Sequence, residues 1–253
     1  MRTSIFAIAS ILLIAGVAKA DGRGGAPAYL EAAVADKARP AADVQLDADR
    51  KPVELMVFAG VKPGAKIADV WPGKGYFSRL FEDAVGPRGH VFLWVPKETE
   101  GMHGDPVKGA QAVAALSPNA SVIVEPVSSF SAPEKLDIVW IRQNYHDLHD
   151  TFMGPSMNIA SFNKGVYRAL KPGGVFLIID HAAAAGSGLR DTDTLHRIDP
   201  ASVKSEVEAA GFKLEAMSPV LANAADDHTK RVFDPTVRGH TDQFVYRFRK
   251  PRR

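Results

Sequence analysis

The fold is decided by residues 66–76, which read KIADVWPGKGY. A short apolar run reaches Asp69, a turn containing Gly73 and Gly75 follows, and an amphipathic stretch begins directly after it. This order of strand, glycine-containing turn and helix start is typical of segments that cradle a nucleotide-type cofactor. The glycines allow a ligand to approach the backbone closely, and Asp69 is placed to hold a polar group of that ligand. Trp71 stands where such turns usually carry a small residue.

The stretches around this segment alternate between strand-like and helix-like patterns. Most of the strand-like stretches are continuous apolar runs, as expected when helices cover both faces of a parallel sheet. The expected strands are residues 66–71, 90–95, 121–125, 136–141, 174–180, 213–218 and 243–249. The expected helices are residues 76–84, 106–116, 156–170 and 200–210. The sequence therefore predicts a doubly wound α/β domain with a mostly parallel, seven-stranded sheet, which takes up residues 61–253.

Residues 1–20 have the pattern of a cleaved signal peptide. Arg2 supplies a positive start, residues 5–17 are apolar, and Ala18-Lys-Ala20 fits a small-x-small cleavage site. The apolar run is shorter than the ~20 residues that a membrane span requires, which favours cleavage over an uncleaved anchor. The expected location is therefore periplasmic or secreted, with no membrane span left after cleavage.

Residues 21–60 are expected to form a helical extension ahead of the α/β domain. Its helices are predicted at residues 27–37 and 47–58, and Asp47 is the expected N-cap of the second. Later in the chain, Asp199 is expected to cap the helix that follows it, because a proline occupies the first helical position.

Charge and cysteine content exclude several classes of function. The chain carries a net charge of +2, and two of its cations, Arg2 and Lys19, belong to the predicted signal peptide. The remaining chain is near neutral, so it lacks the basic field that nucleic-acid binding requires. Cysteine is absent, which excludes disulfides and thiolate metal sites. A small molecule is the expected partner.

Several motifs resemble those of class I methyltransferases, which use S-adenosylmethionine. They are Asp69-x-x-x-Gly73-x-Gly75, the turn VGPRGHV at residues 85–91, and LKPGG at residues 170–174 ahead of a strand. More narrowly, a group of exported bacterial proteins described as predicted methyltransferases is similar at residues 69–76, 196–199, 226–229 and 233–244. The resemblance covers nearly the whole chain after the signal peptide and implies a Rossmann-like fold. It also implies methyl transfer from S-adenosylmethionine to a small acceptor.

The resemblance further implies which residues contact the cofactor. It puts Asp69, Gly73 and Gly75 around the methionine part, with Trp71 at the place of a third glycine. Members of this family usually carry an acid at the end of the second strand to bind the ribose hydroxyls, whereas this chain has no acid there before Glu98. The cofactor-binding residues expected on this basis are Asp69, Trp71, Gly73, Gly75, Tyr76, Ser128, Ser129 and Arg142.

A dense polar cluster, residues 142–150, follows the fourth expected strand, and ligands of doubly wound sheets bind beyond the carboxyl ends of the strands. His146 is the expected general base, because its reference pKa of about 6.5 suits removal of a proton from a methyl acceptor. Asn144 and Tyr145 are expected to orient the acceptor, and Asp147 to orient the imidazole. The alternative is that residues 144–150 only cap and begin the next helix, since Asn and Asp favour helix starts for backbone reasons.

The histidines and a late polar loop leave further alternatives open. His146 and His149 share one helix face, but the other histidines are scattered, so no metal site is assigned. Residues 226–240 form either a binding loop or a surface loop held by its own salt bridges. Beside a methyltransferase, the sequence allows a non-catalytic ligand-binding protein of the same fold, or a metal-dependent hydrolase that uses the histidines.

Overall fold

The computed structural model describes residues 25–154 and 157–252, so the predicted signal peptide at residues 1–20 lies outside the described residues. The strands are β1 (Lys66–Val70), β2 (His90–Pro96), β3 (Ala120–Glu125), β4 (Leu136–Arg142), β5 (Leu170–His181), β6 (Lys213–Ser218) and β7 (Gln243–Arg249). The α-helices are α1 (Ala28–Ala35), α2 (Ala41–Val44), α3 (Asp47–Arg50), α4 (Pro52–Ala59), α5 (Tyr76–Val85), α6 (Pro106–Ala114), α7 (Ile159–Ala169), α8 (Thr192–Leu195) and α9 (Pro200–Ala209). The 3₁₀ turns are η1 (Lys97–Thr99), η2 (Val127–Ser129), η3 (His146–His149) and η4 (Thr151–Met153). Within the described part of the chain, no helix combines the length and the apolar character needed to cross a bilayer.

The described strands join one seven-stranded sheet in the order β3-β2-β1-β4-β5-β7-β6. Strands β1 to β5 pair in parallel, and β7 runs antiparallel to both β5 and β6. The chain winds outward from β1 to β3 on one side and from β4 to the β6–β7 pair on the other. This arrangement confirms the predicted doubly wound, mostly parallel sheet and the approximate position of each predicted strand.

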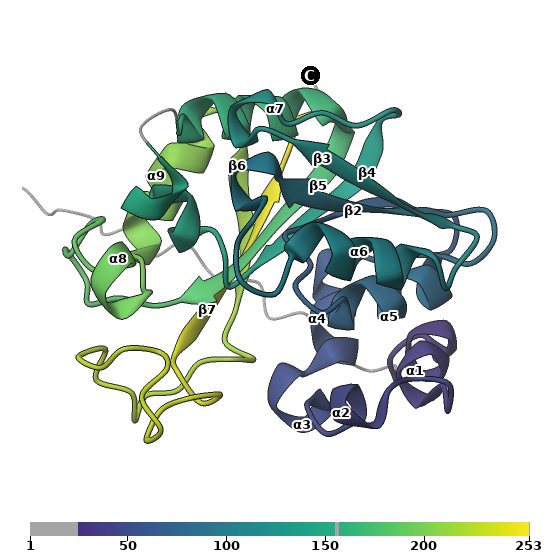
Figure 1. The fold of residues 1–253 in the computed structure, drawn as a ribbon, viewed down its shortest axis with the longest axis horizontal. Helices are drawn as coiled ribbons and strands as arrows, with labels where there is room; N and C mark the ends of the chain where they lie inside the picture. Colours follow the sequence, from purple (N-terminus) through teal and green to yellow (C-terminus); the bar gives the residue numbers. More distant parts are fainter. Residues whose placement is uncertain (1–24, 155–156, 253) are drawn as a thin grey trace, which may run out of the picture.

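The central strands of the sheet are buried on both faces. Along β4, Ile138 and Trp140 pack into one apolar core, and Val139 and Ile141 pack into the other. The first core lies against α1, α4, α5 and α6, and the second lies against α7 and α9 (Figure 1). The apolar strands follow from this arrangement, since a strand covered on both faces has no solvent-facing side.

The N-terminal extension is helical, and the helix expected at residues 27–37 corresponds to α1, but the second expected helix differs from the prediction. The helix expected at residues 47–58 is broken into α3 and α4 at Lys51, whose φ is 48°. Pro52 follows, and the residue before a proline avoids helical backbone. The prediction that Asp47 is an N-cap is wrong, because it lies inside α3 and its carboxylate accepts hydrogen bonds from the Arg39 guanidinium at 2.6 and 2.9 Å.

Other helix ends agree more closely with the sequence. Asp199 caps α9 as predicted, because its carboxylate accepts the backbone N–H of Ala201 at 2.9 Å. The helix expected from residue 156, which lies outside the described residues, corresponds to α7, and Asn158 is its N-cap. The polar segment at residues 144–150 therefore does not begin α7. It forms η3 instead.

The long segment between β6 and β7 is anchored by a buried ion pair. Arg197 is fully buried and donates to the two carboxylate oxygens of Asp226 at 2.8 and 3.1 Å. The same guanidinium donates to the backbone carbonyls of Ala182 and Lys230. A salt bridge thus holds this segment, although the arginine lies outside it, ahead of α9.

Replacing Arg197 by methionine removes the partner of a buried carboxylate, and we expect the free energy of unfolding to fall by about 3–5 kcal/mol. The control, Arg190→Met, removes an exposed arginine from its ion pair with Asp191 and should leave the free energy of unfolding nearly unchanged. Urea unfolding followed by circular dichroism measures both variants. Equal stability of the two would contradict the anchoring role of Arg197.

Candidate functional site

A cavity of about 340 Å³ lies at the carboxyl ends of β1 and β4, where doubly wound sheets bind ligands. Its walls are the loop after β1, the end of β4 with the residues that follow it, and helices of the N-terminal extension. The residues predicted from the sequence to bind a cofactor or acceptor, and found in these walls, are Asp69, Trp71, Gly73, Tyr76, Arg142 and Asn144.

The loop after β1 has a left-handed backbone. Gly73 (φ 58°) and Gly75 (φ 75°) adopt this conformation, and so does Trp71 (φ 55°), which therefore occupies a position that favours glycine. A Cβ on Gly73 would meet no protein atom within 4 Å, so the loop is open to a ligand on that side. A Cβ on Gly75 would lie 2.5 Å from Val113, so this glycine allows α6 to pack against the loop and does not line the cavity.

Asp69 is a buried carboxylate in the cavity wall. It is 3 % exposed, and it accepts the hydroxyl of Ser78 at 2.6 Å. Burial raises the pKa of Asp69 to about 7, and the hydrogen bond from Ser78 opposes this rise. A cationic group of a ligand beside Asp69 would stabilise its charged form.

The N-terminal extension supplies a wall that the sequence did not reveal. Arg50 lies over the ring of Tyr76, 4.4 Å from its centroid, and the Tyr76 hydroxyl donates to Asp47. Asp43 of α2 accepts two hydrogen bonds from the Arg79 guanidinium of α5, at 2.5 and 2.9 Å. No local pattern in α2 or α3 indicates which part of the sheet these helices cover, so only their packing identifies them as site residues.

Arg142, at the end of β4, stands between this cavity and a second one of about 380 Å³. Arg50 and Gln143 also line both cavities, and Phe233 and Arg238 of the β6–β7 segment complete the second. Arg142 donates to Gln143 Oε1 at 2.6 Å, but its Nε has no hydrogen-bond partner among the described residues. Burial lowers the pKa of Arg142 to about 9.

The β2–β3 side of the sheet contributes no described residue to the first cavity. Strand β2 ends at Pro96, and both carboxylate oxygens of Glu98 accept the backbone N–H of Val127, at 3.0 and 3.1 Å. Ser128 and Ser129 lie in η2, and neither lines the cavity. Of the residues predicted to bind the cofactor, the structure therefore gathers Asp69 and Gly73 at the cavity but not Gly75, Ser128 or Ser129.

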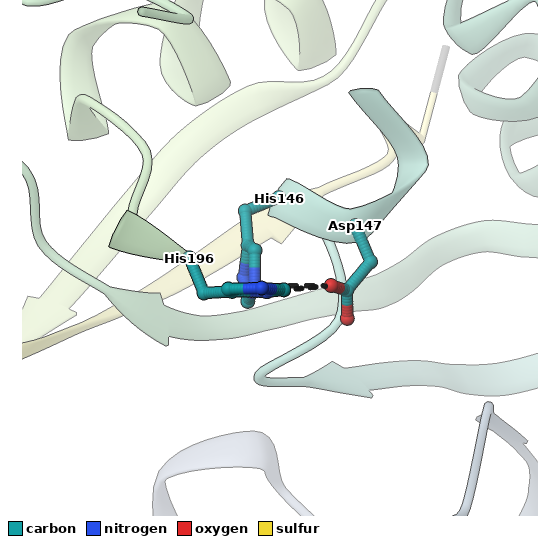
Figure 2. Close-up of side chains that lie close together, drawn as sticks. All are labelled: His146, Asp147 and His196. Atoms are coloured by element: carbon teal, nitrogen blue, oxygen red, sulfur yellow. Dashed lines mark hydrogen bonds and ion pairs between the residues drawn. The ribbon is translucent and has the colours of Figure 1, made fainter. Parts of the chain in front are cut away.

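His146 does not line either cavity but lies in a buried cluster next to them. Its Nδ1 is 2.8 Å from Asp180 Oδ1. Its Nε2 is 3.1 Å from Asp147 Oδ1 and 3.4 Å from His196 Nδ1, and Figure 2 shows these three side chains together. Burial by itself lowers the pKa of His146, but the carboxylates of Asp180 and Asp147 raise it to about 10. A protonated imidazole has no lone pair to accept a proton, so this state of His146 does not suit the general base that the sequence predicts.

The other residues predicted to be catalytic divide into two groups. Asn144 lines the first cavity, and its Nδ2 donates to Asp147 Oδ2 at 2.8 Å, which links the cavity to the cluster. Tyr145 points elsewhere, because its buried hydroxyl donates to Glu206 at 3.0 Å and accepts from Asn163 at 2.8 Å. Its ring belongs to the core under α7 and α9, away from any ligand in the cavity.

The sequence matches no protein-family model and none of the curated proteins. Its fold, however, is similar to many solved structures. One is a SAM-dependent methyltransferase from Aquifex aeolicus, with a TM-score of 0.55 and 16% identity over 83% of this chain and 94% of that one. The S-adenosylmethionine-dependent methyltransferase of Mesorhizobium loti has a TM-score of 0.55 and 15% identity over 81% of this chain and 99% of that one. The [4+2]-cyclase SpnF has a TM-score of 0.57 and 18% identity over 81% of each chain. The fold is that of the class I, Rossmann-like methyltransferases, as the sequence predicts.

Asp69→Asn will change the pH dependence of stability. The folded protein holds the Asp69 proton up to about pH 7, whereas the unfolded chain releases it near the ordinary value of 3.8. Protonation of Asp69 therefore stabilises the folded wild type at low pH, and this stabilisation is lost as the pH rises from about 4 to about 7. Asparagine does not titrate, so the variant does not show this loss. At pH 8 we expect the variant to be more stable than the wild type by on the order of 2–4 kcal/mol, with similar stabilities at pH 4.

Urea unfolding at the two pH values measures this difference. Asp49→Asn, at an exposed position in α3, is the control and should follow the wild type at both. A stability difference between Asp69→Asn and the wild type that does not vary with pH would contradict the raised pKa.

Proposed function

We propose that this protein is an S-adenosylmethionine-dependent methyltransferase that acts on a small acceptor outside the cytoplasm. The observation that carries the proposal is the cavity at the carboxyl ends of β1 and β4, which is built on a left-handed loop open at Gly73. The fold shared with methyltransferases supports the activity. The signal peptide predicted at residues 1–20 supports the location.

The residues around the cavity suit the methionine half of the cofactor. Asp69 offers a buried carboxylate to the ammonium group, and Gly73 allows the ligand to lie against the backbone. Arg142 offers to the carboxylate end an Nε–H that has no partner among the described residues, and Trp71 offers an aromatic face to the positive charge of the ligand. When bound, S-adenosylmethionine supplies an electrophilic methyl group.

The protein's own contribution is to position the reactants, which supplies much of the acceleration of a displacement reaction. Asn144 faces the cavity and is held in place by Asp147. Asp147 in turn is bonded to His146. We assign Asn144 to ligand contact and the other two to positioning, so none of the three needs to remove a proton.

The second cavity is the expected acceptor site, and its charges favour an anionic acceptor. Arg50, Arg142 and Arg238 line it, against one carboxylate, that of the exposed Asp49. In the wall of the first cavity, the buried Trp140 Nε1 also has no hydrogen-bond partner among the described residues. A carboxylate or phosphate provides acceptor oxygens for such donors, and a guanidinium binds either group through two parallel hydrogen bonds.

One observation favours a second candidate, a ligand-binding protein that transfers no methyl group. Because Glu98 accepts the backbone N–H of Val127, the part of the chain that the structure describes places no carboxylate at the end of β2 for ribose hydroxyls. Each missing charge-assisted hydrogen bond costs on the order of 1.5–3 kcal/mol, or about tenfold or more in affinity. SpnF, a cyclase, has a similar fold. The second candidate is therefore a protein that uses the same cavity to bind a different ligand.

Calorimetry of the full chain with S-adenosylmethionine and S-adenosylhomocysteine separates the two candidates. The methyltransferase predicts that both bind, and that Asp69→Ala weakens both about 10- to 100-fold, because it removes one charge-assisted contact. Asp137→Ala, at the amino end of β4, is the matched control and should leave both affinities unchanged. If millimolar ligand produces no heat of binding and no thermal stabilisation, the methyltransferase is rejected in favour of the second candidate.

Inorganic phosphate serves as a probe for the anionic site. We expect phosphate to raise the Tm of the wild type by a few degrees, since about 1 kcal/mol of binding free energy shifts a domain of this size by about 2–4 °C. Arg142→Gln should abolish this shift. Arg190→Gln, which removes an exposed arginine paired with Asp191, should keep it. The same phosphate-induced shift in both variants would contradict the assignment of Arg142 to the ligand.

A further inference from the structure

Three side chains outside the cavity direct their ligand atoms at one point. His146 Nε2 lies 3.1 Å from Asp147 Oδ1 and 3.4 Å from His196 Nδ1, and the last two atoms are 3.4 Å apart. Figure 2 shows the three side chains meeting from two separate segments of the chain. Ligand atoms that lie about 2.0–2.1 Å from a tetrahedral zinc ion are about 3.3–3.4 Å from one another. The triangle therefore has the size that a tetrahedral ion requires.

Asp180 fixes the orientation of the His146 ring, on the side of the ring away from the triangle. Asp180 is fully buried, its Oδ1 lies 2.8 Å from His146 Nδ1, and its Oδ2 accepts the backbone N–H of His146 at 2.8 Å. Binding of an ion displaces the proton from Nε2 of His146. With Nδ1–H donating to Asp180, the neutral imidazole then directs the lone pair of Nε2 at the centre of the triangle. A carboxylate placed behind a histidine in this way is the usual support of a metal-binding histidine.

Asp150 is an independent indication of a cation at this place. Its side chain is buried, and neither carboxylate oxygen has a hydrogen-bond partner among the described residues. Its Oδ2 lies 3.8 Å from His196 Nδ1, too far for a hydrogen bond. A buried carboxylate without a partner is unfavourable, so such groups call for an explanation. A metal ion at the triangle provides the missing partner.

We propose that His146, Asp147 and His196 bind a divalent transition-metal ion of the zinc type, with the carboxylate of Asp150 next to the site. Two imidazoles favour zinc and similar ions over magnesium and calcium, which take oxygen ligands. The carboxylates offset the positive charge of the ion. No thiolate is needed, and the chain contains no cysteine.

The ion joins segments that are distant in the sequence. Turn η3 follows β4, whereas His196 ends α8 fifty residues later, with a left-handed φ of 54°. Asn144, in the wall of the first cavity, donates to Asp147, and the ring of Phe233, in the wall of the second, lies 4.9 Å from that of His196. Metal binding thus stabilises the residues behind both cavities. The inference does not depend on methyl transfer.

Metal analysis of the full chain, purified without an affinity tag, tests the proposal. The protein is stripped with a chelator, offered Zn²⁺ or Mg²⁺, passed through gel filtration and analysed by mass spectrometry. We expect one zinc ion per chain and no magnesium. Substitution with Co²⁺ should give the intense visible absorption of a tetrahedral site. Failure of the wild type to retain zinc would overturn the proposal, because the cluster is then a hydrogen-bonded network alone.

Variants locate the ion. His196→Gln and Asp147→Asn should lose zinc at stoichiometric concentration, and Asp180→Asn, which removes the support of His146, should weaken binding about 10- to 100-fold. His149→Gln is the matched control, because this histidine lies in the same turn but is bonded to Glu206, and it should retain zinc. Circular dichroism shows whether each variant is folded. Equal zinc retention by folded His196→Gln and the wild type would refute the site.

Discussion

Burial of the parallel sheet on both faces is the constraint on which the rest of the structure depends. Helices cover both sides of β1, β4 and β5, so the side chains of these strands are apolar and charged groups collect where the strands end. Asp69, Arg142 and Asp180 occupy such ends in neighbouring strands. The cavities and the histidine cluster lie at this one edge because an ionised group inside the sheet would find neither water nor a partner.

The charged groups at this edge are not all paired. Asp180 is fully engaged, since it accepts the backbone N–H groups of His146 and His181 and supports the His146 ring. Arg142 and Asp150, in contrast, each keep buried polar atoms without a partner among the described residues. Most buried polar atoms in folded proteins are hydrogen-bonded, so these two exceptions support a ligand in the cavity and an ion at the histidine cluster. They add to the cavity and to the triangle of ligand atoms, from which the two proposals were made.

Sequence reasoning succeeded where the signal was local. The strand, glycine turn and helix at residues 66–76 were predicted correctly, because apolar periodicity and left-handed glycines act within a few residues. It failed for Asp47, whose carboxylate binds Arg39 instead of capping a helix, since capping preference cannot compete with a two-bond ion pair that only packing creates. The role predicted for Tyr145 meets the same difficulty, because nothing in its neighbourhood along the chain shows that it faces Glu206 and Asn163.

The sequence by itself therefore determined the class of fold, the strand positions and the edge of the sheet at which the cavities lie. These features follow from periodicity and from the geometry of parallel strands, which are properties of short segments. Only the tertiary structure decided that the N-terminal helices wall the cavity, that Glu98 turns to Val127, and that His196 joins His146 and Asp147. Such contacts connect residues tens of positions apart, and no local pattern records the distance between them after folding.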